Sequence, residues 1–208
     1  MNYVRIIVLT SLFFTSSCST NTSTDQTKSI PETAKGKAFH KFLQKFRVLA
    51  LPMEIRSTAD FSPEIFPATD PNSTDTLFIN NPDTPNRCFG ILPDTATVYR
   101  VVWLAPAEIY RVMLSTFTKS GEKISERQLA IGACGDDCGF SCTETLLIRK
   151  DYTIYSADSI VSGECNDDGK VIPGTTHRYV KAITGKVLNN GKIELSGITT
   201  ISSTQGKN

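Results

Sequence analysis

RYVKAITGKVLNNGKIELSGITTI (residues 178–201) is the clearest structural signal in the chain. Ile193 and Leu195 alternate with Glu194 and Ser196 in the run 193–201, and Asn189-Asn190-Gly191-Lys192 separates this run from the run 178–188. Alternation with a period of two is typical of strands that bury one face. Asn-Gly favours the positive φ angles of a type I′ turn. The stretch therefore predicts an antiparallel hairpin with one face exposed to water.

The same signal recurs through most of the chain before this hairpin. Strands are predicted at 51–56, 99–104, 109–118, 123–131, 143–150 and 152–161. Residues 57–86 are rich in Pro, Asp, Asn and Thr, and we expect long surface loops there, with only 75–79 extended. Because the connections between neighbouring strands are short, the fold class predicted is mainly β. It is a single antiparallel meander of about seven strands, as an open sheet or a partial barrel.

One amphipathic helix is predicted at the N-terminal side of the strands, over residues 32–47. Phe39, Phe42, Leu43 and Phe46 recur at i, i+3, i+4 and i+7, which places them on one face of a helix. Lysines occupy the other positions around the helix. We expect the Phe face to be buried against the sheet.

The N-terminus has the features of a targeting segment. Residues 6–14 contain seven apolar residues in nine and no charge, a length that fits a secretion signal and is too short to span a bilayer. Seven of the twelve residues 19–30 are Ser or Thr, so this part is expected to remain a flexible tether. The predicted organisation is a signal peptide at 1–17, a tether at 18–31, one β-rich domain at 32–202 and a disordered tail at 203–208.

Thr15-Ser16-Ser17-Cys18 resembles the lipobox of bacterial lipoproteins, in which small residues precede an invariant cysteine. The resemblance implies that Cys18 is acylated and becomes the first residue of the mature chain. In this family an Asp directly after the acylated cysteine retains the lipoprotein in the inner membrane. This chain has Ser19 at that position, so the resemblance favours the outer membrane. Whether the chain faces the periplasm or the cell surface stays open. The alternative is an ordinary secretion signal in which Cys18 is incidental.

The balance of positive and negative residues argues against nucleic acid and anionic membranes as partners. The chain carries 22 Lys and Arg against 21 Asp and Glu, without a run of one sign. Nucleic-acid binding needs a clustered cationic surface, so no nucleic-acid partner is expected. A polybasic contact with a membrane is not expected either, which leaves the lipid as the anchor.

Five cysteines besides Cys18 are candidates for disulfides, since exported thiols are normally oxidised, and their odd number leaves at least one without a partner within the chain. The cysteines of the 132–142 loop are Cys134, Cys138 and Cys142. In an up-and-down meander, Cys165 lies at the same end of the sheet as this loop. We therefore expect Cys165 to bond to one of the three, the other two to bond to each other, and Cys88 to stay unpaired. The alternatives are a redox-active thiol or a metal site made of Cys134, Cys138, Cys142 and His177.

No catalytic motif is present. The nucleophile elbow, the H-E-x-x-H zinc motif, the phosphate-binding loop and C-x-x-C are all absent, and no cofactor is expected. His40 and His177 are interpreted as structural histidines. Asp75-Thr76-Leu77, Asp94-Thr95-Ala96 and Asp158-Ser159-Ile160 resemble the O-glycosylation acceptor of Bacteroidota, which implies glycans on Thr76, Thr95 and Ser159, with coincidence as the alternative.

Three classes of function fit these observations. The first is a non-catalytic envelope module that binds a protein or a glycan or assists a membrane complex. The second is a lipocalin-like carrier with a closed barrel around an apolar ligand. The third is a periplasmic hydrolase, which paired carboxylates in a cleft would favour. The layout of export signal, Phe-rich helix and strands resembles uncharacterised β-rich lipoproteins of Bacteroidota, a resemblance that implies no activity.

Overall fold

The computed structural model describes residues 33–57, 62–79, 84–107, 109–132, 134–135 and 137–205, and only the backbone at 202–205. The predicted signal peptide, Cys18 and the tether lie outside the described residues. The helical elements are α1 (Ala34–Leu43) and the 3-10 helices η2 (Pro63–Ile65) and η3 (Thr74–Leu77). The strands are β1 (Met53–Arg56), β2 (Arg87–Ile91), β3 (Tyr99–Ala105), β4 (Arg111–Phe117), β5 (Lys123–Gln128), β6 (Phe140–Ile148), β7 (Thr153–Ser162), β8 (His177–Val187), β9 (Ile193–Leu195) and β10 (Thr199–Gln205).

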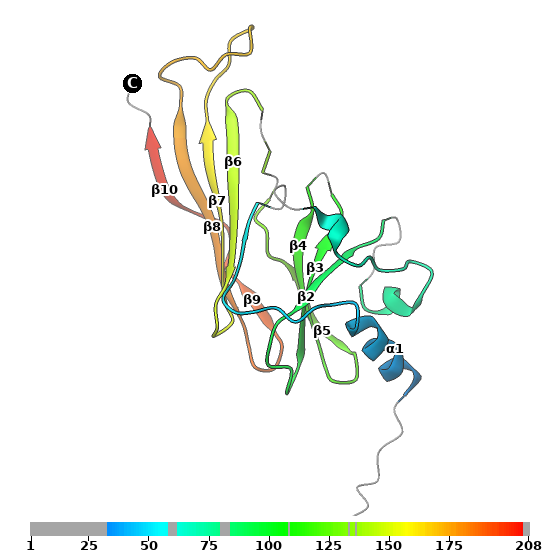
Figure 1. Ribbon diagram of the computed structural model, residues 1–208. Coiled ribbons are helices and arrows are strands. Elements are labelled where there is room, and N and C mark those ends of the chain that lie inside the picture. Colours follow the sequence, from blue (N-terminus) through cyan, green and yellow to red (C-terminus); the bar gives the residue numbers. More distant parts are fainter. Residues whose placement is uncertain are drawn as a thin grey trace, which may run out of the picture. The chain divides into compact units, whose positions relative to one another are not determined.

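The fold is mainly β, and its strands form two antiparallel sheets instead of the single meander predicted from the sequence. One sheet has four strands in the order β2-β3-β4-β5. The other has six strands in the order β1-β6-β7-β8-β10, and β9 also pairs with β8. The chain changes sheet between β1 and β2 and again between β5 and β6. The sheets do not close into a barrel (Figure 1).

The main hydrophobic core lies between the two sheets. Leu104 and Leu114 of the four-stranded sheet belong to the same buried cluster as Leu146 and Ile148 of the six-stranded sheet. All four side chains are at most 1% exposed. The alternate residues of each strand therefore meet in one packed layer, as in a sandwich of two sheets. The upper part of β6, β7, β8 and β10 continues past this layer (Figure 1).

Helix α1 covers the other face of the four-stranded sheet. It spans Ala34–Leu43, shorter than the predicted 32–47, and the side chain of Thr33 accepts a hydrogen bond from Gly36 N–H at its start. Phe39 and Phe42 are fully buried, in one cluster with Phe117 of β4. Strand β3 is consequently buried on both faces.

The hairpin predicted at residues 178–201 is present, but its turn is of another type. Gly191 has a φ of 88°, and Asn190 is not among the residues with positive φ. The Gly191 N–H donates to Leu188 O, and the Leu188 N–H donates to Lys192 O, both at 2.9 Å. This is a three-residue loop that ends in a left-handed glycine, not a type I′ turn. The strand expected at 193–201 is divided into β9 and β10 by residues 196–198.

Three further segments differ from the sequence prediction. Residues 75–79 were expected to be extended, but residues 75–77 belong to the 3-10 helix η3. The Ser73 side chain accepts a hydrogen bond from Asp75 N–H and starts this turn. Strand β2 was not predicted. It lies directly after a stretch rich in Pro and Asn, and it contains Gly90, where an added Cβ would lie 2.4 Å from Leu49. Strand β10 pairs with β8 as far as Gln205, within the range predicted as a tail.

Candidate functional site

The end of the six-stranded sheet where β6 begins and β7 ends carries both disulfides. Cys138 bonds to Cys165 with a Cα–Cα distance of 6.3 Å, and Cys134 bonds to Cys142 with a Cα–Cα distance of 5.1 Å. This is the pairing expected from the order of the strands, although β5 and β6 lie in different sheets. It depends only on the β6–β7 hairpin, which places Cys165 next to the 132–142 loop.

Close backbone contact at this end requires glycine at position 139. Gly139 has a φ of 70°, and its carbonyl oxygen accepts a hydrogen bond of 2.6 Å from Gly163 N–H. A Cβ at Gly139 would lie 2.2 Å from Gly163 O and 3.0 Å from Cys165 Sγ. The glycine therefore lets the two loops approach closely enough for the second disulfide.

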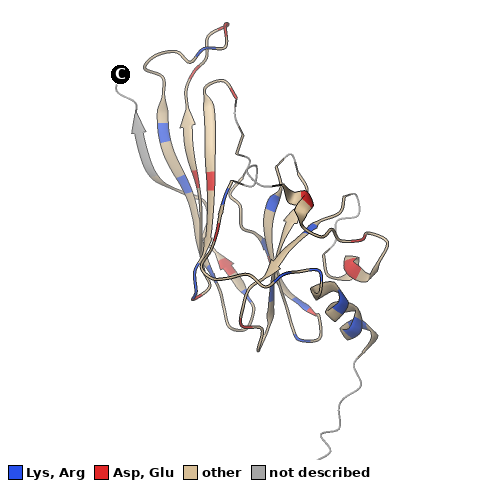
Figure 2. Ribbon diagram, in the orientation of Figure 1, with Lys and Arg blue, Asp and Glu red and all other residues tan. Residues whose placement is uncertain are grey.

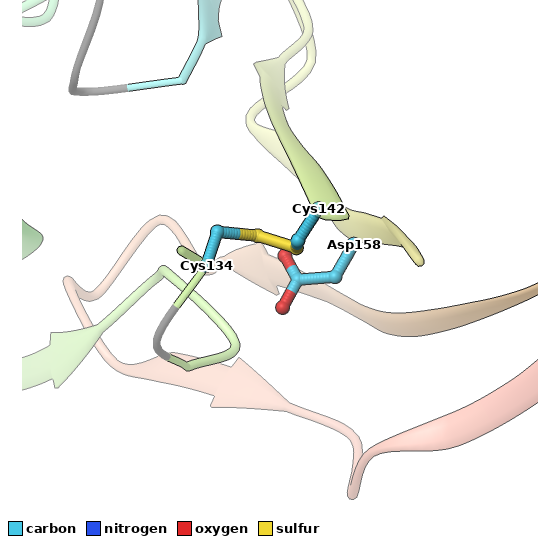
Figure 3. Close-up of side chains that lie close together, drawn as sticks. All are labelled: Cys134, Cys142 and Asp158. Carbon is cyan, nitrogen blue, oxygen red and sulfur yellow. A yellow bond between two sulfur atoms is a disulfide. The ribbon is translucent and has the colours of Figure 1, made fainter. Parts of the chain in front are cut away.

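A carboxylate lies close to the first disulfide. The sulfurs of Cys134 and Cys142 and one carboxylate oxygen of Asp158 all lie within 4.8 Å of one another (Figure 3). Asp158 comes from β7 and is 4% exposed. Its Oδ1 has no hydrogen-bond partner among the described residues.

Asp158 belongs to a row of charged residues across the inner face of the sheet. Glu144 of β6 is directly opposite Asp158, and Asp158 is directly opposite Lys181 of β8. Glu144 is 6% exposed, and its Oε1 also has no partner among the described residues. Burial raises the pKa of Glu144 to about 7, and the nearby charge of Asp158 adds to this effect. Burial likewise raises the pKa of Asp158, against the opposing effect of Lys181.

A small hollow connects this row to the surface. It has a volume of about 60 Å³ and lies between the β3–β4 loop, the segment after β5 and strand β6. Tyr110, Cys134 and Glu144 contribute to its wall. Pockets that bind small organic ligands usually have about 300–1,000 Å³. This hollow is therefore too small for a sugar ring or a peptide, although it gives small groups access to Cys134.

Two larger hollows adjoin one another on the sheet nearby. One has a volume of about 220 Å³ and includes residues of the 163–176 loop, and the other has a volume of about 310 Å³ over strands β6, β7 and β8. They share Ser141 and Val161. Together they form one open surface on the disulfide-bonded end, which we call the outer face.

The register of the strands explains the composition of the outer face. Ser141, Val161 and Arg178 form one row across β6, β7 and β8, and Thr143, Ser159 and Val180 form the next. Hydroxyl groups and small apolar groups therefore alternate, with Arg178 as the one charged side chain in the two rows. Positive and negative residues are scattered elsewhere on both sheets, and Lys residues mark α1 (Figure 2).

The other predicted site residues are Cys88, the two histidines and the alternative metal ligands. Cys88 is a free, buried thiol, and burial raises its pKa to about 12. His40 and His177 are both exposed. The alternative metal site of Cys134, Cys138, Cys142 and His177 is contradicted, because all three sulfurs are used in disulfides.

The three predicted acceptors for O-glycosylation have different surroundings. Thr95 is half-buried in the loop between β2 and β3, and Ser159 is exposed in the middle of β7. Thr76 lies in η3, next to Asp75, which is buried and forms an ion pair with Lys45. Ser159 is the most exposed of the three, and glycosylation stays a prediction.

Sequence reasoning missed Glu144 and Asp158. The signal was present in the sequence. Glu144 is separated by an even number of residues from Leu146 and Ile148, so it lies on the same face of its strand. Asp158 lies on the same face as Ile154 and Ile160 for the same reason. In both strands a carboxylate falls on the apolar face. Such a residue is unusual unless it is paired or neutralised.

Comparison with protein-family models, curated proteins and solved structures gives no match to the chain. Among the described residues, no helix is long and apolar enough to cross a membrane. Two disulfides are typical of an oxidising compartment outside the cytoplasm. Any function therefore rests on the residues of the chain itself.

Proposed function

We propose that the chain is an exported cell-envelope protein that is anchored by lipid at Cys18 and binds a glycan, without catalysis, through the outer face. The observation that carries the proposal is the pair of adjoining hollows on the disulfide-bonded end of the sheet. The lipobox-like sequence supports the anchor and the disulfides support export. The outer membrane is the location that Ser19 favours.

The chemistry of the outer face favours a glycan over other envelope partners. Ser141, Thr143 and Ser159 offer hydroxyl groups, each of which both donates and accepts hydrogen bonds, as glycan hydroxyls do. Val161 and Val180 lie between them and offer apolar contact to the C–H face of a sugar. A surface that is open and shallow fits an extended polymer better than a compact ligand.

The other two functions considered from the sequence lack such support. A lipocalin-like carrier needs a closed barrel around a cavity, but the two sheets do not close and side chains pack the layer between them. A hydrolase needs its carboxylates exposed to substrate. Glu144 and Asp158 are both more than nine-tenths buried, and the hollow beside Glu144 has only about 60 Å³.

A pair of matched substitutions tests the proposal. Ser159 and Thr184 are both exposed on the outward side of the sheet, and Thr184 lies four residues further along β8 than Val180, the partner of Ser159. At about 3.3 Å per residue, this is roughly 13 Å from the hollow. Ser159→Trp should fill the hollow and weaken binding by at least about tenfold, or about 1.4 kcal/mol. Thr184→Trp should leave binding unchanged.

The assay is calorimetric titration of the mature chain, made soluble by Cys18→Ser, with soluble peptidoglycan fragments and with polysaccharide released from outer-membrane lipopolysaccharide. Binding of one of these glycans that is lost in Ser159→Trp alone supports the proposal. Absence of binding to both glycans, or equal loss in the two variants, contradicts it.

A further inference from the structure

The Cys134–Cys142 disulfide has surroundings that a purely structural crosslink does not need. It joins the segment after β5 to strand β6, and the carboxyl group of Asp158 lies against both sulfurs within 4.8 Å (Figure 3). Cys134 is 8% exposed and Asp158 is 4% exposed, whereas Cys142 is half-buried. The carboxyl group and the Cys134 sulfur are thus shielded from water, and the bond is open to the surface on the side of Cys142.

Asp158 is suited to carry a proton at this site. Its Oδ1 is buried and has no donor among the described residues, and an ionised carboxylate without donors is costly in such a place. Burial raises the pKa of Asp158, so the neutral carboxyl group is favoured to higher pH than usual. The charged neighbours in its row are Glu144 on β6 and Lys181 on β8, and Lys181 acts in the opposite direction.

The two sulfurs differ in their access to the surface. Cys142 is half-buried, whereas Cys134 is 8% exposed and borders only the hollow of about 60 Å³ beside Glu144. An incoming thiolate therefore reaches Cys142 Sγ first. Cys134 Sγ is then the leaving atom, and it departs close to Asp158.

We propose that Cys134–Cys142 is a thiol–disulfide exchange centre in which Asp158 is the general acid for the Cys134 sulfur. The reductant is a dithiol on a partner molecule. One thiolate of the dithiol attacks Cys142 Sγ, a new S–S bond forms, and the Cys134–Cys142 bond breaks with its electron pair on Cys134. Asp158 transfers its proton to this sulfur and later regains a proton from water.

The second step releases the partner. The partner's second thiolate attacks the partner sulfur of the mixed disulfide, and Cys142 leaves as a thiolate that takes a proton from water. The partner dithiol has lost two electrons and two protons and become a disulfide. The protein has gained both and holds two thiols. The same steps in reverse would reduce a partner disulfide.

The second disulfide of the same chain is an internal control. No carboxylate of the described residues lies within 4.8 Å of both sulfurs of Cys138–Cys165. If proximity of Asp158 matters, only Cys134–Cys142 should exchange quickly in the folded protein. The proposal is an additional activity and does not depend on binding of a glycan.

The test uses dithiothreitol as the dithiol and the full mature chain with Cys18→Ser. Samples are quenched with an alkylating reagent at intervals, and peptide mapping follows each disulfide separately. Cys134–Cys142 should be reduced at least about tenfold faster than Cys138–Cys165, and Asp158→Asn should slow that reaction by about tenfold or more, the lower range for general acid catalysis. Asp167→Asn, an exposed carboxylate in the loop of Cys165, should change neither rate.

The pH profile of the unmodified protein provides a second measurement that needs no variant. After division by the concentration of dithiothreitol thiolate, the rate at Cys134–Cys142 should fall as pH rises through the pKa of Asp158, and the rate at Cys138–Cys165 should stay flat. Equal rates at the two disulfides, an unchanged rate in Asp158→Asn, or a flat profile at Cys134–Cys142 would overturn the proposal.

Discussion

Replacement of Glu144 by glutamine should change how the stability of the protein depends on pH. The pKa of Glu144 is raised from 4.5 to about 7, so the folded state binds a proton more tightly than the unfolded state between these values. Stability therefore falls as pH rises through this window, and ionisation costs the fold up to about 3 kcal/mol at about 1.36 kcal/mol per pKa unit. Below pH 4.5 the cost is absent. The amide that Glu144→Gln introduces cannot ionise, so the fold of this variant does not bear the cost.

Urea unfolding measures the effect, with the fluorescence of the single tryptophan, Trp103, as the signal. Trp103 is 4% exposed and donates a hydrogen bond to Ser115, so its emission should change on unfolding. Relative to the wild type, Glu144→Gln should gain up to about 3 kcal/mol between about pH 4.5 and pH 8. The control Glu194→Gln, at a side chain 52% exposed, should show no such gain. Parallel stability curves for the wild type and Glu144→Gln would refute the reasoning.

The remaining predictions concern the helix and the free thiol. Phe42→Ala should lower the free energy of unfolding by about 4 kcal/mol, because Phe42 is fully buried and contacts four other rings. The control Ile65→Ala, 70% exposed, should cost less than about 0.5 kcal/mol, and an equally small loss for Phe42→Ala would mean that α1 is peripheral. Cys88 should resist alkylation in the folded chain and react after denaturation, since its thiol is buried and its pKa is about 12. Rapid labelling of native Cys88 would contradict this environment.

Runs of strand-forming residues bounded by turns predict several strands from the sequence alone. Strands β6, β7 and β8 lie close to the predicted ranges 143–150, 152–161 and 178–188. Strand β2 gave no such signal, since Gly90 makes room for Leu49 where an apolar side chain would otherwise stand. Local pattern also cannot tell which strands share a sheet. The crossing from β5 to β6 is set by long-range packing of the two apolar faces.

The candidate site was only partly predictable for the same reason. The positions of cysteines around one hairpin were sufficient to pair Cys165 with the 132–142 loop. The contact of Asp158 with the first disulfide needs the cross-strand register as well as the fold of the loop. A carboxylate on an apolar face marks a strand position as unusual, but its partner becomes visible only when the neighbouring strands are in place.

Membrane fractionation of cells that produce Cys18→Ala tests the central claim, a lipid-anchored exported protein, most directly. Without the cysteine there is no acyl acceptor, and signal processing of the lipoprotein type cannot proceed. The wild type should sediment with the outer membrane and leave it only in detergent, and Cys18→Ala should appear in the soluble periplasmic fraction or retain its signal peptide. A variant of mature size that sediments with the outer membrane to the same extent as the wild type would contradict the lipid anchor.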